Sequence, residues 1–359
     1  MSTSAFDRFE AAPVTDRGHR VDARAAGDAA QVPPAGLDVS VVVPTYGRPD
    51  LLATCLAALC AQDFAAGRYE IIVCDDGPDA ATHACVAHAA AQHAARGLAV
   101  RYLPVTRTQG PAGARNAGWQ AARAPLVAFT DDDTRPDRGW LAAGAAALRH
   151  GAAAAAGTIV VPLPARPTDY EADASGLARA EFATANVFVA RCFLAATGGF
   201  DERFTAAWRE DSDLQFSLLR AGGEIVRAPD AVVVHPVRPA RWGVSIAQQR
   251  KSQFDALLYR KHPVLYRARI GARPPLHYYA ILAAALAAGG AALAGAAAAA
   301  LALLALWFAL TARFCLMRLR GRDRSWRHIA EMAWTSVPIP FLSVYWRLYG
   351  AVRFKVFFL

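Results

Sequence analysis

A stretch of 39 residues without a charged side chain, Pro274–Ala312, constrains the fold of this chain more than any other feature. As one helix it would extend about 58 Å at about 1.5 Å per residue, against a bilayer hydrocarbon core of about 30 Å. Two helices that meet near Gly289-Gly290 or Gly295 fit the membrane better. The alternative, a soluble helix, would need a large partner surface to cover Leu301–Leu310. We therefore predict a transmembrane hairpin at 274–312.

The basic residues of the chain concentrate in two short segments that flank this stretch. The formal net charge is +9, yet residues 1–237 contain 27 acidic residues against 21 arginines. Residues 238–273 hold nine basic residues and residues 313–327 hold six, with one acidic residue in each segment. Because basic residues favour the cytoplasmic side of membrane helices, both ends of the hairpin are predicted to face the cytoplasm. This placement argues against nucleic acid as a partner.

The two ends of the chain and its cysteines give further limits. Residues 1–36 lack apolar periodicity and a basic-then-apolar signal sequence, so we expect a disordered tail. The six cysteines contain no Cys-x-x-Cys pair, which favours thiols in a reducing compartment. Residues 313–359 are predicted to be basic, amphipathic and membrane-associated. Within them, an interfacial helix pair at 329–350 is favoured over a third span.

The segment that precedes the hairpin, residues 238–273, is basic and amphipathic. Its apolar side chains stand among Gln, Arg and Lys, a pattern typical of helices that lie at a membrane surface. These apolar side chains are Ile246, Phe254, Leu257 and Leu258. We predict that this segment lies at the membrane interface.

Residues 37–237 alternate short apolar runs with Ala-rich helical stretches. This alternation predicts an α/β domain with a mostly parallel sheet flanked by helices. The predicted strands cover 39–43, 69–74, 99–103, 126–130, 158–161, 186–189 and 232–235; the predicted helices begin at Pro49, Asp79, Pro111 and Glu210, and a Pro-rich loop runs from 162 to about 175. On the first helix, Leu51, Leu52, Cys55, Leu56 and Leu59 form one apolar face.

Two acidic clusters follow strands that we expect to be adjacent. Asp131-Asp132-Asp133 comes directly after a buried strand, at the sheet end where open α/β domains bind ligands. Three carboxylates at one place repel one another unless a cation or solvent neutralises them. A divalent ion, Mg²⁺ or Mn²⁺, that bridges a diphosphate is the favoured explanation, and a solvated acidic loop is the alternative. His235, which ends a strand before Pro236, is a further candidate ligand or a packed histidine.

Three other motifs are weaker when each is taken alone. Asp75-Asp76-Gly77 follows a strand, but Asp-Gly is also ordinary turn chemistry. Gly110 to Gly118 begins a helix with small residues and Arg115, which allows close approach of a phosphate-bearing ligand, although it is not a P-loop. Glu210-Asp211 begins a helix, where acidic residues also serve as caps that complement the helix dipole.

Taken in order, these segments resemble glycosyltransferase family 2 over about residues 38–236. The matching motifs are Pro44-Thr45-Tyr46-x-Arg48, Asp75-Asp76-Gly77, Gly113-x-Arg115-Asn116-x-Gly118, Asp131-x-Asp133, Gly198-Gly199-Phe200-Asp201 and Glu210-Asp211-x-Asp213-Leu214. The resemblance implies a GT-A fold, Rossmann-like and mostly parallel, and an inverting transfer of a sugar from a nucleotide-sugar donor. A single displacement of this kind needs no enzyme nucleophile.

The resemblance also implies roles for individual residues. Asp211, with Glu210 beside it, matches the general base, and a carboxylate there can take the proton of the acceptor hydroxyl. Either Asp76 or Asp75 matches the carboxylate that reads the base, and Arg115 matches the residue near the diphosphate. The residues predicted to bind the nucleotide-sugar are Pro44, Thr45, Tyr46, Arg48, Asp75, Asp76, Arg115, Asn116, Asp131 and Asp132; those predicted to bind the metal are Asp133, Asp131 and His235.

The acceptor is predicted to be lipid-linked or part of an envelope polysaccharide, at the cytoplasmic face of the inner membrane. Arg238-Pro-Ala-Arg241-Trp242 partly resembles the Gln-x-x-Arg-Trp element of processive synthases, but Arg replaces Gln, so we expect transfer of one sugar. A polyprenyl-phosphate sugar synthase, a processive polysaccharide synthase and a catalytically silent membrane scaffold are the alternatives. Donor selectivity is expected to depend on the loop at 162–185.

Overall fold

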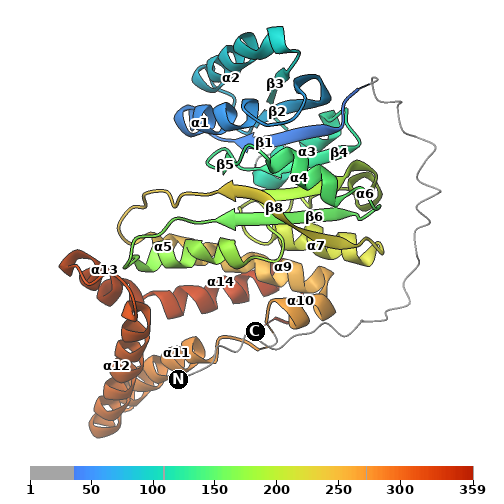
Figure 1. Ribbon diagram of the computed structural model, residues 1–359. Helices are drawn as coiled ribbons and strands as arrows, with labels where there is room; N and C mark the ends of the chain where they lie inside the picture. Colours follow the sequence, from blue (N-terminus) through green and yellow to red (C-terminus); the bar gives the residue numbers. More distant parts are fainter. Residues whose placement is uncertain (1–35, 108–109, 272, 359) are drawn as a thin grey trace.

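The computed structural model describes residues 36–107, 110–271 and 273–358 as an α/β domain followed by a helical C-terminal region (Figure 1). The tail predicted at 1–36 lies outside the described residues, apart from Gly36. The α/β domain is built on an eight-stranded mixed sheet in the order β3-β2-β1-β4-β7-β6-β8-β5. The strands are β1 Val39–Thr45, β2 Tyr69–Asp75, β3 Ala99–Pro104, β4 Leu126–Thr130, β5 Arg135–Pro136, β6 Ala154–Val160, β7 Asn186–Ala190 and β8 Ile225–Val234.

The sheet has a parallel half and a mixed half. Strands β3, β2, β1 and β4 are all parallel to one another. Strand β7 runs antiparallel to both β4 and β6, whereas β8 is parallel to β6 and antiparallel to β5. The sequence predicted that the two acidic clusters follow adjacent strands. This prediction is wrong, because β1 lies between β2 and β4. The two clusters flank the loop that follows β1, so this loop is also part of the site.

The alternation of side chains along β1 explains why helices cover both faces of the sheet. Val39, Val41 and Val43 belong to one core with the helices α1, α2 and α4, whereas Val42 belongs to a second core with α3, α6 and α7. The helices of this domain are α1 Pro49–Cys60, α2 Ala80–His93, α3 Pro111–Ala121, α4 Trp140–Ala147, α5 Asp169–Ala174, α6 Arg191–Thr197 and α7 Glu210–Arg220, with short 3₁₀ turns η2 Ala66–Arg68, η3 Ala94–Arg96 and η4 Ser175–Arg179. Leu51, expected on the buried face of α1, is instead 36% exposed.

Several elements differ from the sequence-based prediction. Helix α5 occupies the predicted Pro-rich loop, where the Thr168 hydroxyl accepts from the Glu171 N–H and the Glu171 side chain accepts in return from the Thr168 N–H. Strand β6 begins at Ala154, earlier than predicted, because a run of alanines carries no strand signal. Strand β8 likewise begins at Ile225.

The C-terminal region joins the α/β domain through a shared apolar core. Phe254, Leu257 and Leu258 are at most 2% exposed and pack with Phe204 of the α/β domain and Phe354 near the C-terminus. The prediction that these three side chains lie at a membrane interface is therefore wrong, because the protein itself covers them. The helices of this region are α8 Val244–Gln248, α9 Gln253–Lys261, α10 Pro263–Arg269, α11 Leu276–Leu293, α12 Ala297–Leu319, α13 Trp326–Ser336 and α14 Ile339–Arg353, with the 3₁₀ turn η5 Gln249–Ser252.

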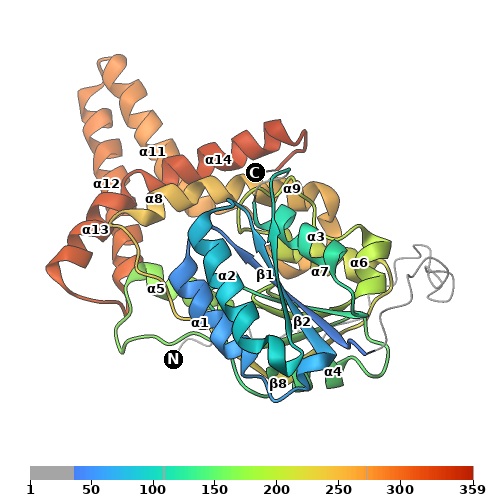
Figure 2. The same cartoon turned by 90° about the horizontal axis from the view of Figure 1, so that it is seen from above.

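Helices α11 and α12 form a hairpin that projects away from the α/β domain (Figure 2). They turn at Gly295, whose φ of +73° is a conformation that favours glycine, and Gly289-Gly290 lies within α11. Both helices are long and apolar enough to cross a membrane, with mean hydropathies of 1.5 and 2.0. Only 17% and 11% of these segments is buried within the protein, unlike a soluble core helix. Helix α12 ends at Leu319, beyond the predicted boundary at 312.

Candidate functional site

The end of β4 and the end of β8 bring three potential metal ligands together. Strand β5 pairs Arg135 with Val234 of β8, and this pairing places His235 beside the acidic triplet. The ligand atoms of Asp131, Asp133 and His235 all lie within 4.8 Å of one another. Two carboxylates and an imidazole form a ligand set that divalent cations accept. The structure thus brings together the three residues that the sequence predicted as metal ligands.

Asp132, the middle residue of the triplet, points into the protein. Its carboxylate is 1% exposed, accepts a hydrogen bond of 2.7 Å from the Thr45 hydroxyl and lies 3.1 Å from the Arg48 guanidinium. Burial raises the pKa of this carboxyl to about 6. The interactions of Asp132 therefore tie the β1 loop to the end of β4, and its contact with the nucleotide-sugar stays a prediction.

Arg115 links the acidic triplet at 131–133 to helix α7. Its side chain is 4% exposed, and it contacts Asp131 at 2.7 Å and Glu210 at 3.3 Å. Burial acts to raise the pKa of Asp131, but the Arg115 guanidinium, together with His235 and Arg48, outweighs it and holds that pKa below its usual value. Asp131 therefore stays ionised, as a metal ligand must.

Glu210 and Asp211 begin helix α7 and differ in exposure. Glu210 is 3% exposed, and burial together with the neighbouring Asp211 raises its pKa to about 8. Asp211 is half-buried, and burial also raises its pKa. A carboxylate with a raised pKa that solvent can still reach is a stronger proton acceptor, so Asp211 suits the role of a general base better than Glu210.

The residue before this pair, Arg209, has a backbone conformation that is unusual for a side chain-bearing residue. Its φ is +74°, a value in the left-handed region that stores strain outside glycine. Two contacts hold it there: Arg209 Nε donates to Asp255 of α9 at 2.6 Å, and the guanidinium lies over Trp208. The C-terminal region therefore fixes the start of α7, a role that the sequence did not predict for Arg209 or Asp255.

A second residue that the sequence did not place in the site is Arg238. Its Nε lies 2.9 Å from a carboxylate oxygen of Asp133, and Arg48 and His235 approach the same carboxylate at 3.9 and 3.4 Å. The sequence signal was present, because Arg238 is the residue that departs from the Gln-x-x-Arg-Trp pattern. The guanidinium groups of Arg48 and Arg238 thus lie beside Asp133, which is favourable for an anionic ligand such as a diphosphate.

The loop after β2 supplies one candidate for recognition of a base. Asp75 is fully buried and accepts hydrogen bonds from the N–H groups of Gly77 and Asp79 and from the Tyr102 hydroxyl, so it shapes the turn. Asp76 accepts from the Gly110 N–H at 2.7 Å, while its other oxygen has no partner among the described residues. Of the two predicted candidates, the structure favours Asp76.

The β1 loop lies over this turn. Tyr46 is 63% exposed, and a side chain at Gly77 would stand 2.5 Å from its ring. Glycine is therefore needed at position 77 so that the ring can lie against the turn. Pro44 is buried within β1, so only the exposed Tyr46 and the half-buried Arg48 of the predicted loop residues can reach a ligand directly.

Asn116, which the sequence assigns to the nucleotide-sugar site, uses its side chain for contacts within the protein. Its amide nitrogen donates to the Phe200 carbonyl and to Glu202, and its amide oxygen accepts from the Phe200 N–H and the Trp119 indole N–H. Two donors and two acceptor positions exhaust the hydrogen-bonding capacity of the amide. Asn116 instead fixes the turn at Gly199, whose φ is +73°.

Residues 40–193 match the family model for glycosyl transferase family 2. These residues form a glycosyltransferase family 2 domain. The match includes Asp76, Arg115, Asp131 and Asp133, whereas Glu210, Asp211 and His235 lie beyond it. The contributions of α7 and β8 to the site therefore lie outside the segment that matches the family model.

Curated relatives agree with the family 2 assignment. The chain is 29% identical over 110 residues to the glycosyltransferase AglE of Haloferax volcanii, and this alignment covers 31% of this chain and 35% of that protein. It is 38% identical over 103 residues to the succinoglycan biosynthesis protein ExoO of Rhizobium meliloti, covering 28% and 27%. The pre-mycofactocin glycosyltransferase of Mycobacterium tuberculosis is 28% identical over 225 residues, covering 57% and 45%. The chain therefore spans less than half the length of these relatives.

A solved structure shares the fold. The mannosyltransferase PcManGT from Pyrobaculum calidifontis, solved in complex with GDP-Man and Mn²⁺, superposes with a TM-score of 0.55 at 23% sequence identity. The alignment covers 90% of each chain. The predicted GT-A fold is thereby confirmed for the family 2 domain.

Proposed function

We propose that this protein is a metal-dependent, inverting glycosyltransferase that transfers one sugar from a nucleotide-diphosphate sugar to an acceptor at the membrane. The observation that carries the proposal is the group of Asp131, Asp133 and His235 in a family 2 domain, with Asp211 nearby on α7. Hydrolytic enzymes that form a covalent intermediate need an activated nucleophile. A direct displacement needs a base and a stabilised leaving group, and these are the groups that the site offers.

A divalent cation fits the ligand set of the site. Two carboxylates and an imidazole converge, and Arg48, Arg115 and Arg238 balance the carboxylate charge. When bound, Mg²⁺ or Mn²⁺ would stabilise the charge that develops on the departing nucleoside diphosphate. The related mannosyltransferase fold with GDP-Man and Mn²⁺ supports both the donor class and the metal class.

The protein's own residues have separable tasks in this scheme. Asp211 accepts the proton of the acceptor hydroxyl as its oxygen attacks the anomeric carbon. Arg115 holds Asp131 ionised and aligned, and Asp132 fixes the β1 loop through Thr45 and Arg48. One attack from the face opposite the leaving group inverts the anomeric centre.

The hairpin supports an acceptor at the membrane. In this arrangement residues 37–237 form the catalytic domain and 238–273 attach it to the two spans at 274–312, while 313–359 return along the domain. The basic flanks place the catalytic domain in the cytoplasm, at the inner membrane. A lipid-linked or envelope-polysaccharide acceptor would reach the site from the membrane.

The donor site can be tested by thermal-shift measurements on the detergent-purified protein with UDP, GDP, dTDP and CDP, each with and without Mn²⁺. We expect one nucleotide to stabilise the protein, and only with Mn²⁺. Asp133→Asn should abolish this stabilisation, while Asp137→Asn, an exposed carboxylate four residues away, should keep it. Equal shifts without Mn²⁺ would remove the metal from the proposal, and no shift with any nucleotide would favour the silent scaffold.

A further inference from the structure

Each carboxylate of the acidic triplet at 131–133 is paired with an arginine. The three arginines come from different elements: one from α3, one from the loop after β1 and one from the segment after β8. The pairs are Asp131 with Arg115 at 2.7 Å, Asp132 with Arg48 at 3.1 Å and Asp133 with Arg238 at 2.9 Å. Because the charges of the three pairs cancel, a divalent cation that arrives alone meets little net attraction. An anionic ligand that arrives with the cation removes this difficulty.

Arg238 is the most weakly held of these three arginines. Its side chain is 49% exposed, against 4% for Arg115 and 30% for Arg48. Among the described residues it has one ion-pair partner, Asp133, whereas each of the other two arginines approaches two carboxylates. It also lies in a segment without helix or strand, between the end of β8 and the start of α8. Arg238 can therefore leave its carboxylate with the least cost to the fold.

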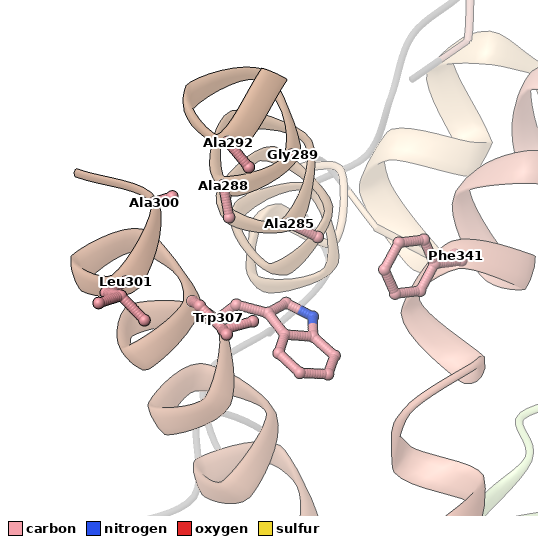
Figure 3. A pocket seen from close by; sticks show the side chains of 9 residues that line it. Ala285, Ala288, Gly289, Ala292, Ala300, Leu301, Trp307 and Phe341 are labelled. Carbon is pink, nitrogen blue, oxygen red and sulfur yellow. The ribbon is translucent and has the colours of Figure 1, made fainter. Parts of the chain in front are cut away.

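Two cavities of the described residues differ in chemistry, and Arg238 lines one of them. The cavity between α11, α12 and α14 has a volume of about 390 Å³, and in Figure 3 alanines of α11 and the rings of Trp307 and Phe341 line it. None of its lining residues is charged. The other cavity, of about 120 Å³, lies at the triplet, where Asp133, Arg135 and Arg238 are among its lining residues. This space allows the Arg238 guanidinium to turn away from Asp133.

We propose that Arg238 is a displaceable counter-ion of the metal site, which gives up Asp133 and moves to the diphosphate when a divalent cation and the nucleotide bind together. This inference rests on the proposed function and adds the regulation of its metal site. A guanidinium binds a phosphate group through two parallel hydrogen bonds, so Arg238 exchanges one charge-assisted contact for another. The exchange frees Asp133 for the cation. The cation and the nucleotide therefore raise the affinity of each other by the same factor.

The test measures Mn²⁺ binding and nucleotide binding separately, on the full-length protein in detergent. Bound Mn²⁺ is followed by the loss of the sharp electron paramagnetic resonance signal of free Mn²⁺, with and without the nucleotide that stabilises the protein, and a protein-free blank corrects for Mn²⁺ held by the nucleotide. Nucleotide affinity is measured by thermal shifts at saturating Mn²⁺. The variants are Arg238→Gln and Arg135→Gln. Arg135 is a matched control, because it is exposed, lines the same cavity and has no ion pair among the described residues.

We expect the two affinities of Arg238→Gln to change in opposite directions. Without nucleotide, this variant should bind Mn²⁺ about tenfold more tightly than the wild type, because Asp133 loses one competing charge-assisted contact. At saturating Mn²⁺ it should bind the nucleotide about tenfold more weakly, because the diphosphate loses a contact of the same kind. Arg135→Gln should change either affinity by less than about threefold, since salt screens a charge that makes no direct contact.

Three results would overturn the proposal. An unchanged Mn²⁺ affinity in Arg238→Gln would make the residue a fixed phosphate ligand, and a loss of both affinities would make its role structural. Equal changes in Arg135→Gln would assign the effect to net charge. A wild type that binds Mn²⁺ and nucleotide neither separately nor together would instead contradict the proposed function.

Discussion

Replacing Arg115 by glutamine should destabilise the protein by about 3 kcal/mol. The guanidinium is 4% exposed and pairs with Asp131 and Glu210, and removal of one partner from a buried ion pair typically costs about 3–5 kcal/mol. The lower end applies for two reasons. Glu210, whose pKa is about 8, holds a proton at neutral pH, and the Asp131 side chain is 27% exposed, so water can partly solvate it. The loss is a large part of a typical stability of about 5–15 kcal/mol.

The assay is thermal unfolding of the detergent-purified protein, followed by intrinsic fluorescence at pH 7 without metal. A loss of about 3 kcal/mol corresponds to an apparent Tm lower by about 6–12 °C for unfolding of the α/β domain at residues 37–237, which falls in the size range of about 150–250 residues. Arg138→Gln is the control, because Arg138 forms an exposed pair with Asp63 at 3.2 Å and such pairs contribute little. If the Tm of Arg115→Gln stays within 2 °C of the control, roughly the effect of less than 1 kcal/mol, the buried pairs do not stabilise the site as argued.

Three further variants test other parts of the structure. Between pH 5 and 8.5, Glu210→Gln should lose less stability than the wild type. The folded wild type keeps the Glu210 proton up to a pKa of about 8, whereas the unfolded chain releases it near 4.5, so the stability that this proton contributes is present at low pH and is lost as the pH rises. Parallel pH profiles of Tm for the two proteins would refute this reasoning. Asp169→Arg and Arg318→Asp should each lower the Tm, and the double variant should recover at least half of the loss; no recovery would mean that their contact is not energetically coupled. Gly118→Ala should destabilise by about 1–2 kcal/mol, since its Cβ would lie 2.3 Å from Val42, a clash that exceeds the gain in helix propensity; an equal or higher Tm would show that α3 can move away from β1.

The elements with a strong periodic pattern could be predicted from the sequence. The strand at 126–130 has the predicted bounds, and α7 begins at Glu210 as expected, because β-branched runs and acidic first turns are local signals. The hairpin could also be predicted, since the absence of charge over 39 residues leaves few alternatives. Strand order could not, because the position of β1 between β2 and β4 depends on long-range pairing.

Roles within the site could be predicted only where residue type limits the chemistry. Asp131, Asp133 and His235 converge as expected. They could be predicted because carboxylates and imidazole are common protein ligands of divalent cations. Asp132 and Asn116 were assigned to the ligand by their motifs, yet both side chains turn inward, and a sequence motif does not encode the direction of each side chain within it.

The apolar faces of the C-terminal helices show a similar limit. The pattern at Phe254, Leu257 and Leu258 fits a membrane surface and a protein core equally well, since both reward the same burial of apolar area. The core was formed by Phe354 and Phe358, from a segment about a hundred residues further along the chain. No local pattern indicates which of two apolar environments a helix will meet.

The central claim is tested most directly by sugar transfer with Asp211→Asn. The donor is the radiolabelled nucleotide-sugar of the nucleotide that stabilises the protein, the acceptor source is a bacterial membrane lipid extract, and Mn²⁺ is present. The wild type should label the organic phase, whereas Asp211→Asn should keep the Mn²⁺-dependent nucleotide shift and transfer no sugar above background. Undiminished transfer by Asp211→Asn, or no transfer by a wild type that binds the nucleotide, would contradict the account.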